Sequence, residues 1–325
     1  MARLHRRAFM ATAAAGILSP ALVRGQGAWP AGRQIKIVVP FPPAGATDVL
    51  GRIMAERFGE YWGARVIVEN KGGAGGNIGA EQVAKAAPDG DNILIASFGM
   101  AANPALYTAM TYDPIKDFEP VTLIAMVPNI LVAGKHVPYN SVQEFVAYAK
   151  ANPGKVTYAS SGIGTSVHLA GEIFQKLVGT KMQHVPYRGA ALAVQDILAG
   201  QIDVIFDNIT STLPQVRAGA LKGLGITTAR RSTHAPDLQP IAEVVPGYDV
   251  TSWFGLFLPK GTPSPIIERI SADTKRALAD EGVKTKLAAL GGESVGSSPE
   301  ELRAFLRSET DKWGKLITEL GIKAN

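Results

Sequence analysis

Residues 35–48, I-K-I-V-V-P-F-P-P-A-G-A-T-D, constrain the fold more strongly than any other segment of the chain. The β-branched majority of the first five residues predicts a strand buried on both faces, and Pro40 must end it because proline donates no hydrogen bond to a sheet. Apolar residues then recur at helical spacing, so we expect a helix with Thr47 or Asp48 as its N-cap. The helix start predicts an anion-binding site above the strand, although an ordinary strand-to-helix turn also fits this segment alone.

The same design returns in the middle of the chain. A strand is predicted at residues 155–159, followed by the loop S-S-G-I-G-T-S at 160–166 and then by apolar residues on one helical face. Hydroxyls, glycines and a helix start in one short loop predict a second anion-binding site. We therefore expect a second lobe built like the first.

The remaining segments continue the alternation of strands and helices. Further strands are expected at 65–70, 92–97, 182–186, 203–206, 221–227 and 252–258, and further helices at 80–87, 141–150, 192–198 and through 217. Residues 98–104 are expected to form a loop at the carboxyl end of a strand, which is where open α/β sheets bind ligands.

Helix starts near the end of the chain carry clear capping signals. One helix is expected to be capped by Thr262 or Ser264, and the last by Ser297 or Ser298 with Pro299 as its first residue.

The order of these elements predicts two domains with a cleft between them. The apolar run 121–133 is interrupted by Pro128 and Asn129, which predicts two short strands and a crossing between lobes. The strand at 252–258 comes after a complete second lobe, so the chain is expected to return to the first. We predict a discontinuous domain 1 at 29–130 and 251–325, and a continuous domain 2 at 131–250.

Composition describes a globular chain without a nucleic-acid partner. The chain has 325 residues, is 46% hydrophobic and carries a formal charge of +5. The first 28 residues hold four arginines and no acids; beyond them 29 Lys and Arg face 28 Asp and Glu, so no basic stripe is expected.

Residues 1–28 are predicted to be an export signal. A charged start, an alanine-rich apolar middle at 9–23 and small residues at 25–28 fit cleavage near 25–28 and location in the periplasm. The sequence H-R-R-A-F-M at 5–10 is similar to a twin-arginine signal, with a Sec signal as the alternative. No cysteine is present, so neither a lipoprotein anchor nor a disulfide is expected.

Cofactor and metal signals are weak. The glycines of 71–79 do not have the dinucleotide-binding spacing, and no phosphate-loop Lys-Ser/Thr pair follows them. The histidines beyond the predicted signal form no pairs at helical metal-binding spacing. We therefore predict no cofactor and no metal.

Five motifs in order resemble the Bug family, the periplasmic receptors associated with tripartite tricarboxylate transporters. They are the 35–48 segment, V-E-N-K-G-G-A-G-G-N-I-G-A-E, N-P-A-L-Y, Y-A-S-S-G-I-G-T-S-V-H-L-A-G-E and H-V-P-Y-R-G-A. The resemblance implies an α/β type II periplasmic binding protein, or Venus flytrap, each lobe a βα sheet with helices on both faces. It runs from about residue 35 to the C-terminus, and it departs from the family pattern at Ala44, where a glycine is usual.

The resemblance implies a receptor that holds one carboxylate of a small organic acid between two loops. The ligand-binding residues carried over are Phe41, Pro42, Gly45, Ala46, Thr47, Ser97, Asn103, Ser161, Gly164, Thr165, Ser166, His168 and Asp207. Trp253 and Phe254 are guesses for the variable end of the ligand, and Arg188 is either a ligand clamp or a solvated loop residue. The implied ligands are dicarboxylates, tricarboxylates, aromatic acids or amino acids, and the implied partners are transporter subunits in the membrane or a sensor. The receptor is expected to be a monomer.

A hydrolase is the competing hypothesis. Ser166, His168 and Asp207 supply the residue types of a catalytic triad, but no G-x-S-x-G elbow surrounds the serine. We predict no catalytic residues. Opposite a carboxylate-binding loop, Asp207 is expected to repel a second carboxylate and to attract an ammonium or hydroxyl group.

Overall fold

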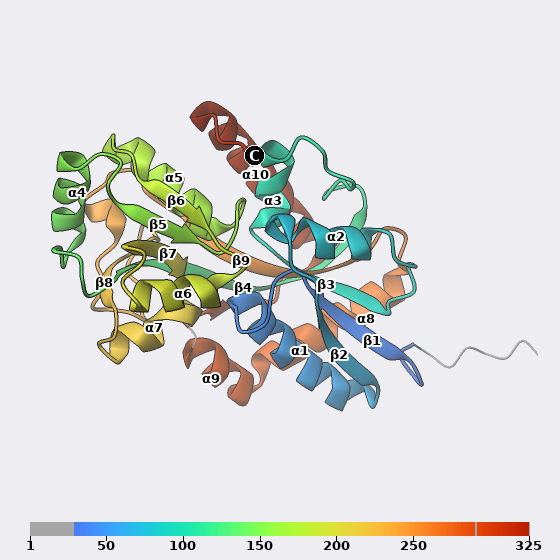
Figure 1. The fold of residues 1–325 in the computed structure, drawn as a ribbon. Helices are drawn as coiled ribbons and strands as arrows, with labels where there is room; N and C mark the ends of the chain where they lie inside the picture. The colour runs from blue at the N-terminus through green and yellow to red at the C-terminus, as the bar shows by residue number, and fades with distance from the viewer. Residues whose placement is uncertain (1–28, 290, 325) are drawn as a thin grey trace, which may run out of the picture.

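The structure is a computed structural model that describes residues 29–289 and 291–324. The predicted export signal and its cleavage site lie outside the described residues. The chain forms two α/β lobes around a curled sheet, with strand order β2-β1-β3-β9-β4-β7-β5-β6 (Figure 1). β8 and β10 pair with β4 beside this path.

The strands are short apart from β4 and β9. Their bounds are β1 Gln34–Val39, β2 Arg65–Asn70, β3 Asn92–Ser97, β4 Phe118–Ala133, β5 Thr157–Ser160, β6 Gln183–Pro186, β7 Val204–Asn208, β8 Lys222–Ile226, β9 Thr251–Pro259 and β10 Glu293–Ser294.

Helices separate most of the strands. Their bounds are α1 Ala46–Trp62, α2 Asn77–Ala84, α3 Gly99–Leu106, α4 Val142–Ala151, α5 Ser166–Val178, α6 Ala190–Leu198, α7 Ile209–Arg217, α8 Ser264–Ala279, α9 Glu281–Ala289 and α10 Pro299–Leu320. Two 3-10 turns add Ala74–Gly76 and Ile241–Glu243.

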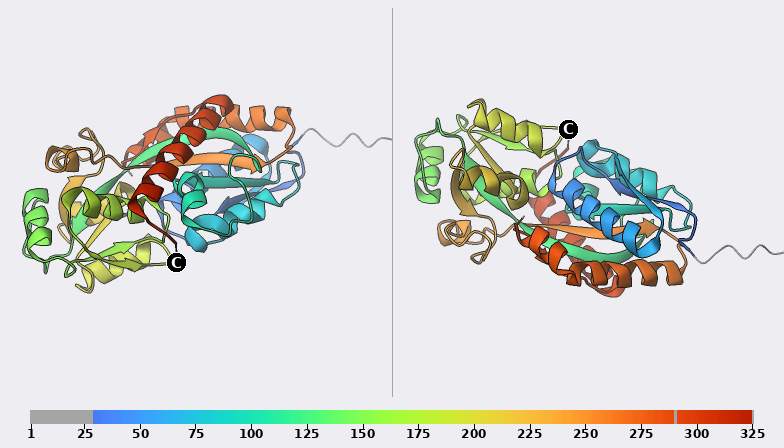
Figure 2. Two further views of the ribbon diagram at one scale, coloured as in Figure 1. Left: turned by 90° about the horizontal axis from the view of Figure 1, so that it is seen from above. Right: turned by 90° about the horizontal axis from the view of Figure 1, so that it is seen from below.

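The first lobe has helices on both faces of its strands, which explains the apolar run in β1. Ile37 belongs to the core that also includes residues of α1 and α8, and Val38 belongs to the core that also includes residues of α2, α3 and α10. Successive side chains of a strand point to opposite faces, so both layers are anchored on one strand. Figure 2 shows the two helical layers in views from above and below.

β4 is one continuous strand, so the predicted break at Pro128 and Asn129 was wrong. Pro128 is aligned with Thr251 of β9, whereas Asn129 is aligned with Asn208 of β7. The proline thus stands where the partner strand changes, a place where a missing N–H donor costs little. The same strand therefore runs through both lobes.

Three predicted helix starts were also wrong. α1 begins at Ala46 with Gly45 as N-cap, and the Asp48 carboxylate accepts the Ala44 N–H instead of capping the helix. α2 begins at Asn77, before the predicted 80, and α8 follows Pro263, whose ring supplies no cap. The N-cap prediction at Ser298 is confirmed.

Residues 98–104 were wrongly predicted as a loop, since they belong mostly to α3. Gly99 and Pro104 hid the helix, because both residues usually break the helical pattern. Among the described helices, none is long and apolar enough to cross a membrane.

Candidate functional site

A cavity of about 700 Å³, counting its open mouth, lies between the two lobes; we call it the interlobe cavity. It lies at the carboxyl ends of β1, β3, β5 and β7, as the topology of open α/β sheets predicts. Of the predicted site residues, its lining includes Phe41, Pro42, Gly45, Ala46, Thr47, Ser97, Ser161, Thr165, Ser166 and Asp207. Asn103, Gly164 and His168 do not line it.

Asp48 fixes the loop between β1 and α1, which we call the first-lobe loop, through hydrogen bonds. Its carboxylate accepts the Ala44 N–H at 3.0 Å, the Asn70 amide at 2.9 Å and the Arg52 guanidinium at 2.9 Å. Burial raises the pKa of Asp48, but these hydrogen bonds outweigh burial and hold the pKa below its ordinary value. The Asn70 amide also donates to the Phe41 carbonyl at 3.0 Å, which fixes the other end of the loop.

Ala44 adopts a left-handed backbone conformation with φ 70°. An L-residue in this region is less stable than glycine by about 1 kcal/mol, because its Cβ approaches the next carbonyl oxygen. The methyl group at this departure from the family pattern therefore leaves the loop conformation in place, with some backbone strain.

The loop between β5 and α5, which we call the second-lobe loop, ends at Thr165, the N-cap of α5. The Thr165 hydroxyl donates to the Gly162 carbonyl at 2.7 Å and accepts the His168 N–H at 3.3 Å. Its hydrogen is already used, so Thr165 shapes the loop. The Ser166 hydroxyl accepts the Asn129 amide at 3.2 Å and donates to the Asn129 Oδ1 at 3.5 Å. The second hydrogen bond is long and therefore weak, so the hydroxyl can turn its hydrogen toward a ligand.

Asn129 is a site-positioning residue that the sequence reasoning missed. It is fully buried on β4, donates to the Phe206 carbonyl at 2.8 Å, and accepts the Asn208 amide at 2.6 Å. It thereby ties together the starts of α5 and α7. Because Asn129 follows Pro128, the sequence indicated a strand break at this point, and it carried no other signal for the role of Asn129.

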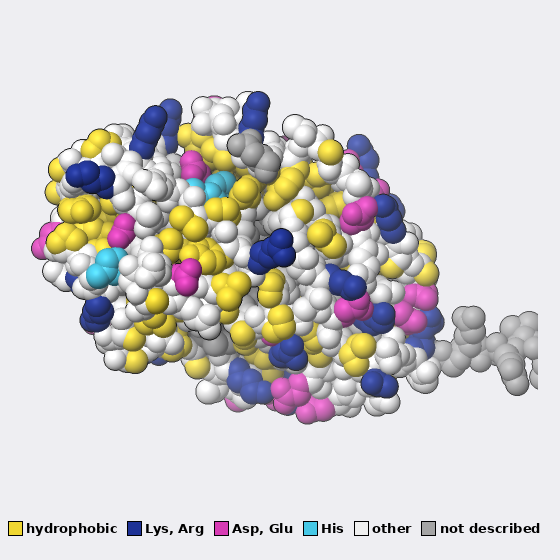
Figure 3. Space-filling view, in the orientation of Figure 1, with side chains coloured by type: hydrophobic (Ala, Val, Ile, Leu, Met, Phe, Trp, Pro, Cys, Tyr) yellow, Lys and Arg dark blue, Asp and Glu magenta, His cyan; other side chains and the backbone are white. Residues whose placement is uncertain are grey.

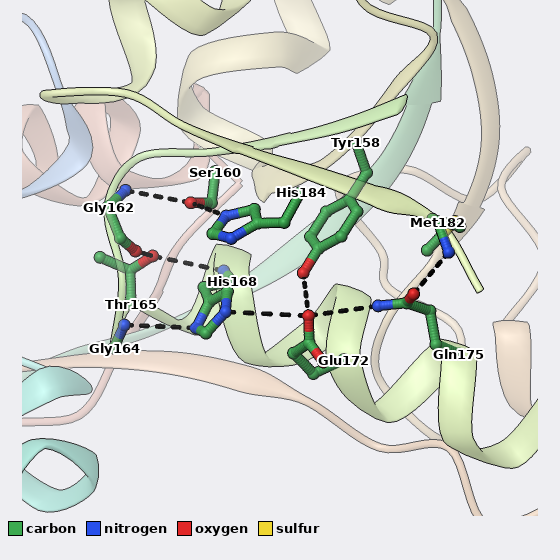
Figure 4. A network of polar contacts seen from close by, with 10 residues as sticks. All are labelled: Tyr158, Ser160, Gly162, Gly164, Thr165, His168, Glu172, Gln175, Met182 and His184. Atoms are coloured by element: carbon green, nitrogen blue, oxygen red, sulfur yellow. Dashed lines mark hydrogen bonds and ion pairs between the residues drawn. The ribbon is translucent and has the colours of Figure 1, made fainter. Parts of the chain in front are cut away.

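His168 lies behind the loop, in the network of Figure 4. Its Nδ1 accepts the Gly164 N–H at 3.3 Å, and its ring stacks on His184 with centroids 4.4 Å apart. His184 in turn bonds the Ser160 hydroxyl at 2.7 Å. Burial lowers the pKa of His168 to about 3, with a further contribution from His184, and burial lowers the pKa of His184 to about 4. The Glu172 carboxylate lies 3.8 Å from the His168 Nε2, but burial outweighs its attraction for a proton, so both rings are neutral and orient the loop.

Asn103 and Gly164 meet at a contact between the lobes. The Asn103 amide donates to the Gly75 carbonyl at 3.1 Å, and a Cβ built on Gly164 would lie 2.2 Å from its Oδ1. Nearby, the Tyr107 hydroxyl donates to the Ile163 carbonyl at 3.2 Å. We call this group, Gly75, Asn103, Tyr107, Ile163 and Gly164, the interlobe clasp.

β9 supplies the back of the cavity. Ser252 and Phe254 line it, whereas Trp253 points to the opposite face of the strand and packs on Phe305. Phe254 therefore lies in the cavity wall and Trp253 lies outside it, and contact of Phe254 with the variable end of the ligand stays a prediction.

Arg188 and Asp207 are the charged side chains of the lining. Arg188 is exposed, whereas Asp207 is 1% exposed. The rest of the lining is apolar or uncharged, and the middle of the face in Figure 3 is mostly hydrophobic and uncharged around one basic side-chain cluster. Within the described residues, no group of three or more potential protein ligands could hold a metal ion.

The residue types of a catalytic triad are present but are not assembled. Ser166 bonds Asn129, and the Nδ1 of His168 accepts a backbone N–H. Neither oxygen of Asp207 has a hydrogen-bond partner of normal geometry among the described residues. No proton can therefore pass from Ser166 through His168 to Asp207 along this arrangement.

Two α/β lobes, a cavity between them and two helix starts facing that cavity define a solute receptor of the periplasmic-binding-protein type. Comparison with known proteins makes the class more specific. The family model described as tripartite tricarboxylate transporter family receptor matches residues 50–322. The chain belongs to this family, which includes the Bug proteins and consists of periplasmic solute receptors, not enzymes.

Solved structures support the same placement. The chain is 36% identical to R. palustris Rpa4515 with adipate, with a TM-score of 0.88 over 91% of this chain and 99% of that one. It is 35% identical to the periplasmic binding protein BugD, with a TM-score of 0.87 over 90% and 99%. It is 32% identical to MatC from Rhodopseudomonas palustris with bound malate, with a TM-score of 0.84 over 88% and 99%.

Proposed function

We propose that this receptor binds a small organic acid in the interlobe cavity, with one carboxylate held between the starts of α1 and α5. The observation that carries the proposal is that both helix N-termini and the Ser166 hydroxyl, whose own hydrogen makes only a long bond to Asn129, meet at one cavity. The first N–H groups of a helix have no partner within the helix, and the helix dipole favours an anion beside them.

Neutral donors suit a carboxylate that must be released again. Thr47, Ser97 and Ser161 add hydroxyls to the lining. Such groups replace the hydrogen bonds that the anion loses on leaving water, without a buried cation whose own desolvation must be offset. The adipate and malate in the related structures are small acids of this kind, which supports the proposal.

We also propose that the protein is an exported, monomeric periplasmic receptor that delivers its acid to a tripartite tricarboxylate-type transporter or a sensor. Family membership supports this role. Uptake of the labelled acid by cells should fall when the chain is deleted and recover when it is restored. Unchanged uptake, together with loss of an acid-induced transcriptional response, would favour sensing.

A thermal-shift screen of residues 29–325 against mono-, di- and tricarboxylates, aromatic acids and amino acids tests the binding proposal. An acid at one hundred times its Kd should stabilise the folded state by about 2.7 kcal/mol. The Thr165→Val, Ser166→Ala double variant should lose this response. If no acid raises the melting temperature of the wild type, the proposal is wrong.

Ser141→Ala is the matched control. Ser141 caps α4 as Thr165 caps α5, because its side chain accepts the Glu144 N–H, but it does not line the cavity. Loss of either cap should lower the free energy of unfolding by about 1 kcal/mol. Only the α5 variant should lose the response to the acid.

A further inference from the structure

Asp207 is a buried acceptor in the wall of the interlobe cavity. It ends β7, is 1% exposed and lines the cavity. Neither carboxylate oxygen has a hydrogen-bond partner of normal geometry among the described residues. Burial raises the pKa of Asp207 to about 7 and outweighs hydrogen bonding from the Asn208 N–H and the Ser211 hydroxyl, which lowers the pKa although the geometry of both contacts lies outside normal limits. A buried, unpartnered carboxylate is costly unless a further group meets it.

The elements packed around Asp207 supply no cation. β4 pairs Ile130 with Asp207, and the lining residues from α5, α7 and β9 are uncharged. His168 on α5 points its Nδ1 at the backbone of Gly164, away from the cavity. Arg188, before α6, is the other charged residue of the lining, but its side chain is exposed, and no ion pair to Asp207 occurs in the described part of the chain.

Chemistry limits what can meet such a carboxylate. When ionised it only accepts hydrogen bonds, so it fits a hydroxyl or an ammonium group. A second carboxylate at hydrogen-bond distance cannot also be ionised without strong repulsion, and such pairs share one proton.

We propose that Asp207 sets the ligand class of the interlobe cavity: it accepts a hydrogen bond from a hydroxyl or ammonium group of the bound acid, and it takes a second carboxylate only together with one proton. This inference rests on the proposed function. When Asp207 is ionised, a dicarboxylate dianion without a donor therefore binds together with one H⁺, which is then held between Asp207 and the ligand. Hydroxy acids and amino acids bind without that proton.

Isothermal titration calorimetry tests the proton balance in the wild type. The probes are succinate and adipate, which lack a donor when ionised, and malate and aspartate, which carry one, each taken forward if it shifts the melting temperature in the screen. In buffers of different ionisation enthalpy, a donor-free probe should bind at pH 8 with uptake of close to one proton, and at pH 7, where Asp207 is already about half protonated, with uptake of about half a proton. Its Kd should approach a tenfold weakening per pH unit above pH 7. Malate or aspartate should bind with little proton uptake.

Substitutions separate Asp207 from other titrating groups. In Asp207→Asn the Kd of the donor-free acid should become independent of pH between 6 and 8 and should be tighter than wild type at pH 8. In Asp207→Leu, which removes the acceptor, malate or aspartate should bind at least tenfold more weakly. Asp237→Asn, an exposed aspartate outside the lining, should behave like the wild type.

Each result decides between the two proposals. If a donor-free dicarboxylate binds the wild type equally at pH 6 and 8 without proton uptake, the role of Asp207 is overturned while the receptor function stands. The same holds if the donor-bearing acids bind Asp207→Leu as they bind the wild type. If no acid in the whole screen binds, both proposals fail. The wild-type calorimetry needs no variant, so poor folding of a substituted chain does not prevent the decision.

Discussion

At the scale of single residues, Gly164 shows how tightly the two lobes meet. Its φ is 88°, and a Cβ added to it would lie 2.2 Å from the Asn103 Oδ1, which leaves no room for a side chain. Gly164→Ala should therefore oppose the closed arrangement specifically, because Asn103 belongs to the other lobe. We expect ligand affinity to fall at least tenfold, measured by calorimetry with the acid found in the screen.

Gly154→Ala is the control for this prediction. Gly154 has φ 77° but nothing within 4 Å of an added Cβ. Both substitutions should cost about 1 kcal/mol of stability through the left-handed backbone. Affinity should change only for Gly164, and an equal loss of affinity in both variants would contradict the role of the clasp.

The same residues show what the sequence could and could not predict. The loops at Thr47 and Ser166 follow a local pattern of strand, glycine, hydroxyl and helix start, so their place at the cavity was predictable. The contact between Gly164 and Asn103 joins segments from two lobes, and no local pattern encodes it. The isolation of Asp207 likewise depends on which side chains the fold leaves out of its surroundings.

At the scale of elements, α5 connects the loop between β5 and α5 to two stacked imidazoles, the buried His168 and the half-buried His184. Because burial lowers the pKa of His168 to about 3 from 6.5, the folded state binds fewer protons than the unfolded state at pH 5. The contribution of His168 to stability is complete above pH 6.5 and is lost as the pH falls toward 3. Between pH 7 and pH 5 this loss should be about 2 kcal/mol.

His168→Asn tests that contribution, because an Asn side chain keeps an acceptor for the Gly164 N–H but does not titrate. Urea unfolding should show that the wild type loses about 2 kcal/mol more than the variant between pH 7 and pH 5. Asp207, whose raised pKa acts in the opposite direction, is common to both proteins and cancels. Equal slopes from pH 7 to pH 5 would show that His168 is not held neutral by the fold. Between pH 7 and pH 8 the two slopes should coincide.

Elements were predictable to different degrees for physical reasons. The hydrophobic pattern of the sequence predicts β1 and α1, whereas β4 contains a proline that would end most strands. Proline is tolerated there because the strand exchanges β9 for β7 at that point, which is a property of the sheet and not of the segment. α3 was missed because its glycine and proline weaken the helical pattern, whereas its packing against α10 joins distant segments that no local pattern reveals.

At the scale of the whole molecule, the clasp couples ligand binding to the arrangement of the lobes. The structure has the Tyr107 hydroxyl bonded to the Ile163 carbonyl across the lobes, so this arrangement is a closed one. A ligand that touches both lobes favours the closed state, and any contact made only in that state adds to apparent affinity. Tyr107→Phe removes one such contact, which is worth about 0.5–1.5 kcal/mol.

We therefore expect Tyr107→Phe to weaken the binding of the acid about two- to tenfold. Small-angle scattering should show a larger radius of gyration for the ligand-free variant than for the wild type, and the two should coincide at saturating acid. Tyr148→Phe, on α4 and outside the cavity lining, removes a hydroxyl without touching the clasp and should leave both quantities unchanged. If Tyr107→Phe binds the acid as tightly as the wild type, the hydrogen bond to Ile163 does not help to hold the lobes closed, and the donors of the cavity alone must supply the closing free energy.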